Sequence, residues 1–201
     1  MVFPKGGTEI ETAVLLLVYT LAGFALKLGD DLLDELDRSD LSWVPLSAAG
    51  ILFGIIAVTS EWGLALIAAV VLGVSLSGKV NRPQFGVGFV LIAAFLLVMG
   101  IPLPSDWLRW VALVSVMVLA AAIDEKGNNW ADNAESSILA AFFAHRFMLK
   151  ISVVIISFII IEFALTAIGL WLFDLGYEVA SRITARLKLR DGDAPDCSTH
   201  Q

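Results

Sequence analysis

Long apolar runs separated by short charged segments are the feature that most constrains this chain. A bilayer core of about 30 Å needs roughly 20 helical residues, and the runs 12–28, 41–59, 63–77, 85–103 and 107–123 approach that length. Only 16% of the residues are charged, and the mean hydropathy is +0.85. These values exclude a soluble globular domain, in which about a quarter of the residues are charged. The sequence therefore predicts an all-α, polytopic integral membrane protein.

The stretch 138–173 is apolar but less regular. Residues 138–149 include His145 and Arg146, Lys150 follows, and residues 151–173 form a run of full span length. Continuous helix over 136–173 would be about 57 Å long, which is too long for one crossing. The stretch must bend, re-enter or form two spans. We therefore expect a bundle of six or seven transmembrane helices within residues 1–173.

The C-terminal part is polar and basic. Apolar residues recur every four positions, opposite basic residues, at Leu175, Val179, Ile183 and Leu187. This pattern predicts a basic amphipathic helix over 174–190 at the membrane surface, with a stop-transfer flank as the alternative. Residues 191–201 are predicted to be a disordered tail. The positive-inside rule favours a cytoplasmic C-terminus and cytoplasmic charged links if the chain crosses seven times.

The charged links lie on one side of the predicted bundle. Successive spans alternate in direction, so the links 30–40, 78–84 and 124–137 face the same side. The other side has only residues 61–62 and 104–106. The sequence therefore predicts that the polar chemistry gathers at one membrane interface.

The first charged link contains an aspartate-rich stripe. On a helix, Asp34 lies about 40° from Asp30, and Asp37 lies about 20° to its other side. Like charges on one stripe repel unless something offsets them, and Mg²⁺ takes oxygen ligands of this kind. We expect a Mg²⁺ site at Asp30, Asp31, Asp34 and Asp37, with a solvated acidic cap as the alternative.

A second polar segment follows the fifth run. Asp124, Asn128 and Asp132 are spaced by four, so they share one face if the segment is helical, and they complete the predicted metal ligands. Because Asp30, Asp34 and Asp124 would hold the metal against a substrate, we predict that they are the catalytic residues.

Cationic residues on the same side could bind a phosphate. Arginine suits bidentate phosphate contacts and lysine acts as a point charge. The predicted substrate-binding residues are Lys79, Asn81, Arg82, Arg146 and Lys150. Positive-inside topology alone is the alternative for Lys79 and Arg82. The net charge of −7 argues against a nucleic-acid partner.

Glu162 is an isolated carboxylate within the last apolar run. An ionisable group at membrane depth is costly and is a functional hypothesis by default. A cation or proton-coupled transporter or channel using Glu162 is the alternative function. Asp174 and Tyr177 follow, and helix capping is the simpler account of Asp174. Gly23, Gly50, Gly54 and Gly73 are predicted to be close-packing positions between spans.

The segment Asp30-Asp31-x-x-Asp34, together with the Asp124 region, resembles the paired motifs of UbiA-type intramembrane prenyltransferases. The chain is also similar in size and span number to CDP-alcohol phosphotransferases. These resemblances imply a Mg²⁺-dependent transferase that acts on an isoprenoid or glycerolipid phosphate or diphosphate at the cytoplasmic interface. The implied partners are membrane lipids and a lipid-phosphate substrate. An intramembrane aspartyl protease, a non-catalytic assembly subunit and a homo-oligomer remain open.

Overall fold

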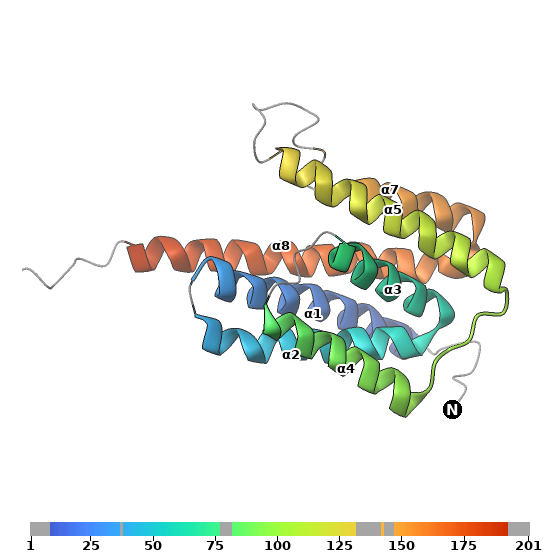
Figure 1. The fold of residues 1–201 in the computed structure, drawn as a ribbon, viewed down its shortest axis with the longest axis horizontal. Helices are drawn as coiled ribbons and strands as arrows, with labels where there is room; N and C mark the ends of the chain where they lie inside the picture. The colour runs from blue at the N-terminus through green and yellow to red at the C-terminus, as the bar shows by residue number, and fades with distance from the viewer. Residues whose placement is uncertain (1–8, 37, 77–81, 132–141, 143–146, 193–201) are drawn as a thin grey trace, which may run out of the picture.

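The chain folds into helices packed side by side along one direction (Figure 1). A computed structural model describes residues 9–36, 38–76, 82–131, 142 and 147–192, and no strand occurs among them. The helices are α1 (Glu9–Asp34), α2 (Ser39–Thr59), α3 (Glu61–Leu76), α4 (Pro83–Met99), α5 (Trp107–Ala131), α7 (Phe147–Ile159), the short 3₁₀ helix η1 (Ile161–Phe163) and α8 (Ala164–Gly192). The all-α prediction is confirmed for these residues.

Among the described residues, four segments are long and apolar enough to cross a membrane: Glu9–Asp34, Ser39–Thr59, Trp107–Asp124 and Ile161–Lys188. This is fewer than the six or seven predicted spans. Shorter apolar helices cover Glu61–Gly73, Pro83–Met99 and Phe147–Ile159. The five predicted apolar runs correspond to α1 to α5. Local chemistry sets the bounds of α4, since Pro83 occupies its first turn, where no N–H is required, and Gly100 ends it with a φ of 93°.

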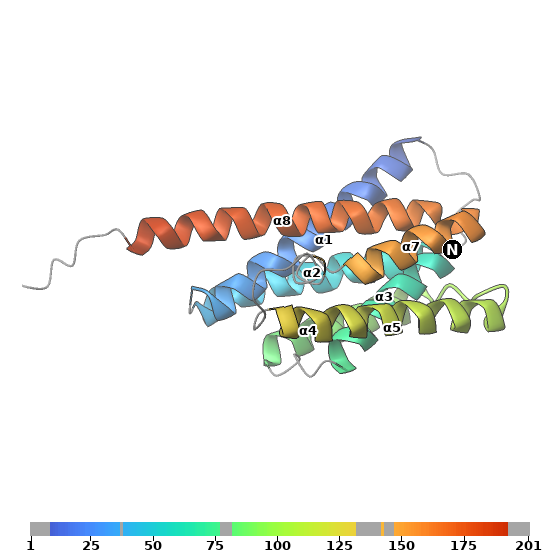
Figure 2. The same ribbon diagram turned by 90° about the horizontal axis from the view of Figure 1, so that it is seen from above.

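Successive helices alternate in direction, and this arrangement gathers the polar links at one end (Figures 1 and 2). The C-terminal ends of α1, α3 and α5 lie at the same end as the starts of α2, α4 and α7. We call this the charged end, defined by Asp30, Asp34, Arg82, Asp124 and Lys188. The opposite end contains the turn from α2 to α3, the start of α5 and the turn from α7 to α8. The described helix ends that border the predicted links therefore lie at one end of the bundle, while residues 37, 78–81 and 132–137 of those links lie outside the described residues.

Glycines allow the central helices to touch. A Cβ atom on Gly23 would lie 1.9 Å from the carbonyl oxygen of Phe173, and one on Gly176 would lie 2.0 Å from that of Thr20. The backbones of α1 and α8 are therefore in contact where the two helices cross. The other predicted packing glycines have the same role: Gly50 faces Gly88, Gly54 faces Phe95, and Gly73 faces Ala121. All four glycine predictions are confirmed.

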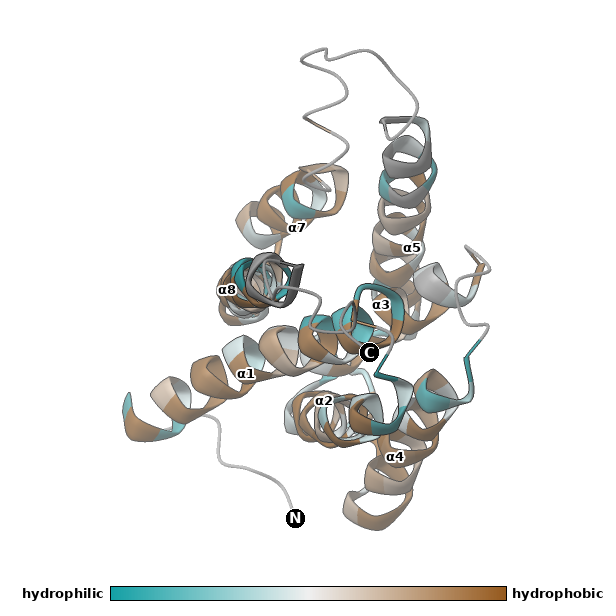
Figure 3. Cartoon of the chain, turned by 90° about the vertical axis from the view of Figure 1, so that its left-hand side faces the viewer, coloured by the Kyte–Doolittle hydropathy of each residue, from teal (hydrophilic) through white to brown (hydrophobic). Residues whose placement is uncertain are grey.

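The core contains large side chains from most of the helices, including Tyr19, Ile56, Leu66, Met117 and Phe163. Many other large apolar side chains face outward, such as Leu97, Leu108 and Phe158, each more than 80% exposed. Figure 3 looks onto the charged end: hydrophobic residues follow the helices along their length, and hydrophilic residues gather at helix ends. Outward apolar faces of this extent suit acyl chains and not water.

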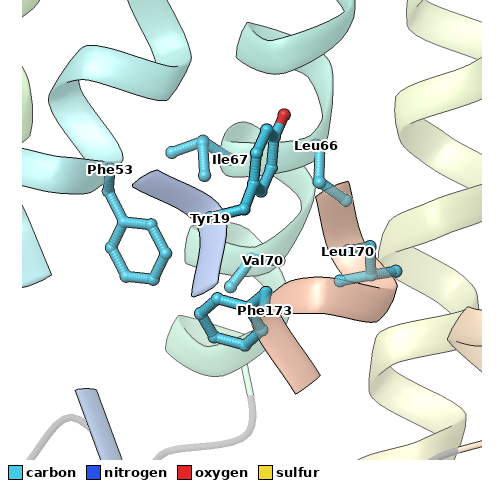
Figure 4. A pocket seen from close by; sticks show the side chains of 7 residues that line it. All are labelled: Tyr19, Phe53, Leu66, Ile67, Val70, Leu170 and Phe173. Atoms are coloured by element: carbon cyan, nitrogen blue, oxygen red, sulfur yellow. The ribbon is translucent and has the colours of Figure 1, made fainter. Parts of the chain in front are cut away.

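One small apolar cavity lies between α1, α2, α3 and α8 (Figure 4). Its volume of about 10 Å³ admits at most a single water molecule. The hydroxyl of Tyr19 points away from the rings of Phe53 and Phe173 (Figure 4) and bonds to Thr166. The cavity is therefore a packing gap and not a ligand site.

The last apolar stretch differs from its prediction in two respects. The chain turns at Ile160, so the predicted run 151–173 is divided between α7 and α8. Glu162 has an exposed side chain in this turn, so it lies at the start of the candidate span Ile161–Lys188 and not in the middle of a span as predicted. No break follows Phe173, because α8 is continuous to Gly192, so the predicted helix 174–190 is the last part of a longer one.

Candidate functional site at the charged end

The last turns of α1 carry a buried ion pair that faces α8. The Lys27 ammonium lies 2.7 Å from the Asp31 carboxylate and 3.7 Å from that of Asp30. Asp31 is only 3% exposed, and it also accepts a hydrogen bond from the hydroxyl of Thr184 on α8. The Lys27 ammonium lies 5.2 Å from the ring centroid of Tyr177, which is also on α8. These contacts join α1 to α8 through charge as well as through glycine packing.

A second, exposed ion pair continues this contact toward solvent. Lys188 Nζ donates to Glu35 Oε2 at 2.6 Å, with both side chains more than half exposed. The hydrogen bond and the positive charge of Lys188 hold the pKa of Glu35 below its ordinary value. α1 and α8 are therefore tied together over the whole charged end.

Asp124 caps a neighbouring helix. Its two carboxylate oxygens accept hydrogen bonds from the backbone N–H groups of Met148 and Leu149, at 2.9 and 2.7 Å. These N–H groups belong to the first turn of α7, where backbone donors have no partner within the helix. A carboxylate there also complements the helix dipole. Asp124, 2% exposed, therefore fixes the start of α7 against α5.

A third ion pair lies deeper in the bundle. Lys150 on α7 is 2.7 Å from the carboxylate of Asp174 on α8. The lysine side chain is 10% exposed and that of Asp174 43%. The ammonium also lies over the rings of Phe147 and Trp171, 5.2 and 5.9 Å from their centroids. Asp174 is inside α8, so its predicted capping role is wrong and its observed role is to pair with Lys150.

The predicted metal ligands occupy different environments. Asp30 is half-buried, Asp34 is exposed at the end of α1, and Asp31 and Asp124 are buried in the contacts described above. Asn128 lies on α5, whereas Asp37 and Asp132 lie outside the described residues. Within the described ranges, no three His, Cys, Asp or Glu side chains form a group that could hold a metal ion.

The predicted phosphate-binding residues are described only in part. Arg82 is exposed at the start of α4, and Lys150 is buried against Asp174. Lys79, Asn81 and Arg146 lie outside the described residues, as does His145.

The opposite end is held by a compact set of hydrogen bonds. The Glu61 carboxylate accepts a hydrogen bond from the backbone N–H of Ser105 at 2.9 Å, and the Trp110 indole donates to the Glu61 carbonyl at 2.9 Å. Trp62 stacks edge-to-face on Phe163, with ring centroids 6.2 Å apart. These contacts join α3 to the start of α5 and to the turn that carries Glu162.

Sequence reasoning missed Thr184 and the partner of Lys150. A signal for Thr184 was present, because Gly176, Ala180 and Thr184 are spaced by four, and small residues at that spacing predict a helix contact. No comparable signal pairs Lys150 with Asp174, since the pairing depends on where the chain turns.

Comparisons with known proteins do not assign a family. A scan of protein-family models, a search of curated proteins and a search of solved structures each found no match to this chain.

Proposed function

We propose that this protein crosses the membrane seven times, with α1, α2, α3, α4, α5, α7 and α8 as its spans. In this proposal it binds a lipid phosphate or diphosphate at the charged end together with Mg²⁺, and it acts on that substrate as an intramembrane enzyme. The charged end faces the cytoplasm.

The observation that carries the proposal is that several charged helix ends lie at the same end of the bundle. The acidic end of α1, the end of α5 and the basic start of α4 share one end of the bundle (Figures 1 and 2). At the opposite end, by contrast, the described carboxylate Glu61 joins α3 to the start of α5. A phosphate bound at the charged end would have the carboxylates of α1 and the Arg82 cation at the same end of the bundle.

The carboxylates best suited to Mg²⁺ are Asp30 and Asp34. They lie one turn apart on α1, within its helical part, and Asp34 is exposed. Mg²⁺ commonly takes one or two carboxylates and fills its remaining positions with water and substrate phosphate. Two aspartates are therefore enough when the lipid supplies oxygen ligands. When bound, the ion would polarise the phosphate oxygens and neutralise charge on the leaving group.

The remaining residues of the chain hold and orient the substrate. Arg82, exposed at the start of α4, offers bidentate contacts to phosphate. Asp31 and Asp124 hold α1 and α7 in position, so we assign them a positioning role beside their predicted role as metal ligands. The outward apolar faces accommodate the lipid chain.

Binding of two lipids by purified protein tests the proposal. An isoprenyl diphosphate and phosphatidic acid are titrated by native mass spectrometry with Mg²⁺ and with a chelator. We expect the double variant Asp30→Asn/Asp34→Asn to lose Mg²⁺-dependent binding at least about tenfold. The matched control is Glu9→Gln/Glu11→Gln, which removes two acids from the other end of α1. Equal binding by both double variants would overturn the proposal.

A second function is supported by the Lys150–Asp174 pair. Charged pairs among apolar helices mark ion or proton pathways in membrane proteins. A proton-coupled transporter could bind and release a proton at this ion pair, in place of the Glu162 site that the sequence suggested.

Proton flux into liposomes distinguishes the two functions. A transporter should lose flux in Asp174→Asn and keep it in Glu162→Gln and in Asp30→Asn/Asp34→Asn. Absence of flux from the unmodified protein, with lipid binding intact, would exclude transport through this pair.

A further inference from the structure

The positions of the tryptophans divide the bundle into bands. Five of the six lie near the two ends of the helices: Trp43 and Trp130 toward the charged end, and Trp62, Trp107 and Trp110 toward the opposite end. The sixth, Trp171, lies inside α8 next to the Lys150 ammonium. Trp43, Trp107 and Trp130 are each at least 40% exposed.

The spacing between the two sets matches a bilayer. Trp110 and Trp130 are about 30 Å apart along α5, at 1.5 Å per residue. On α2, Trp43 lies about 24 Å from the helix end at Thr59, and Trp62 follows in the first turn of α3. The hydrocarbon core of a bilayer is about 30 Å thick, and tryptophan concentrates at both of its boundaries.

The side chains between and beyond the two sets agree with this division. Between them, large apolar side chains such as Leu97, Leu119 and Ile155 face outward, each more than half exposed. Beyond Trp43 lie the exposed acids Asp34 and Asp40, and near Trp107 lies the exposed Asp106.

We infer that the two tryptophan sets are interfacial belts that bound the lipid-facing band of this protein. The occupant of the band is the acyl-chain region of a phospholipid bilayer. The inference rests on the proposed membrane crossings and adds where the membrane begins and ends.

The belts place the Lys150–Asp174 pair inside the hydrocarbon region. Asp174 follows Phe173, which touches Gly23. Gly23 lies six residues, or about 9 Å, before Gly29 on α1. Gly29 packs against Leu46 near the start of α2. Counted along these helices, the pair lies about 13 Å inside the level of Trp43.

A second count along α5 agrees with this depth. Asp124 lies about 9 Å inside Trp130, and its hydrogen-bond partners on α7 directly precede Lys150. Asp30, Asp34 and Arg82 are instead close to the belt at the charged end.

Depth-dependent quenching in vesicles tests the belts. The protein is reconstituted into phosphatidylcholine that carries bromine either near the glycerol or near the chain ends. Variants retain one tryptophan each, with the others changed to phenylalanine. The tryptophans retained in turn are Trp43, Trp107, Trp130 and Trp171. We expect the first three to be quenched at least about twofold more by the shallow label, and Trp171 at least about twofold more by the deep label.

The outcomes separate the belts from the membrane crossings. Quenching of all four tryptophans without a depth pattern would overturn the belts while leaving membrane insertion intact. Quenching by neither label would contradict insertion itself. If a multiple variant does not fold, single Trp→Phe changes in otherwise unmodified protein give the same information, because each removes one component of the quenched signal. A lost signal with the wrong depth preference then counts against the belts.

Discussion

Asp31 is a buried polar link between α1 and α8. It is buried, paired with Lys27 at 2.7 Å and hydrogen-bonded by Thr184 across the helix interface. A buried carboxylate that loses a donor keeps its desolvation cost without compensation. Its neighbour Asp30 is half-buried, so adjacent aspartates of the same motif have different environments.

Thr184→Val tests this contact. The change removes the hydroxyl donor to Asp31 with little change of shape. We expect the free energy of unfolding in mixed detergent micelles to fall by about 1–3 kcal/mol. Thr59→Val is the matched control, since the Thr59 hydroxyl bonds only to the carbonyl of Ile55 in its own helix. A loss of equal size in both variants would contradict the role of Thr184.

The titration of Glu35 reports on the same interface, through its ion pair with Lys188. Lys188 lowers the pKa of Glu35. The ion pair is therefore fully formed at a pH above the ordinary pKa of a glutamate, and it is lost as the pH falls through the lowered pKa. In a carboxyl-carbon NMR titration, Glu35 should titrate at a lower pH in the unmodified protein than in Lys188→Gln. Identical titration curves in the two proteins would show that the contact does not form.

At the scale of the helices, close backbone packing is the device that joins α1 to α8. Gly23 and Gly176 each face a carbonyl oxygen of the other helix, with no room for a methyl group. Backbone atoms cannot rotate away as a flexible side chain can, so any side chain here must separate the two helices.

Gly176→Ala should therefore destabilise the protein, by about 1–3 kcal/mol. Gly86→Ala in α4 is the control, because its added Cβ would meet nothing within 4 Å, and alanine is a better helix former. Stability in micelles is expected to fall for the first variant and to hold or rise for the second. The opposite order would refute the packing described for α1 and α8.

Asp124 has a measurable structural role apart from any metal. Asp124→Ala removes the cap of α7 and should lower the free energy of unfolding by about 0.5–2 kcal/mol. Asp124→Asn retains a capping side chain and should lower it less. Both are read out by thermal unfolding in detergent with a chelator present. Equal losses in the two variants would indicate that charge, and not capping, dominates.

The sequence predicted the helices well where one pattern governed them. The apolar runs follow from membrane thickness, and the packing glycines follow from residue size. A bend or turn within 136–173 was predicted, but its position at Ile160 was not, because apolar residues continue through it without a break in composition. The pairing of Lys150 with Asp174 depends on that turn, so it too was out of reach.

At the scale of the whole molecule, the two ends of the bundle have different chemistry. One end joins α3 to α5 through Glu61 and its partners, while the charged end gathers Asp30, Asp34 and Arg82. The sequence predicted this asymmetry and the residue types, but it did not predict which aspartates hold helices together. That division depends on burial, which appears only once α8 lies against α1.

Mn²⁺ binding is the measurement that tests the proposed Mg²⁺-dependent lipid-phosphate site most directly. Mn²⁺ replaces Mg²⁺ and is followed by electron paramagnetic resonance of purified protein, with and without an isoprenyl diphosphate. The proposed site predicts that the lipid strengthens Mn²⁺ binding at least about tenfold and that Asp30→Asn/Asp34→Asn abolishes this gain, while Glu9→Gln/Glu11→Gln preserves it. Lipid-strengthened Mn²⁺ binding that persists without Asp30 and Asp34, or no such strengthening in the unmodified protein, would contradict it.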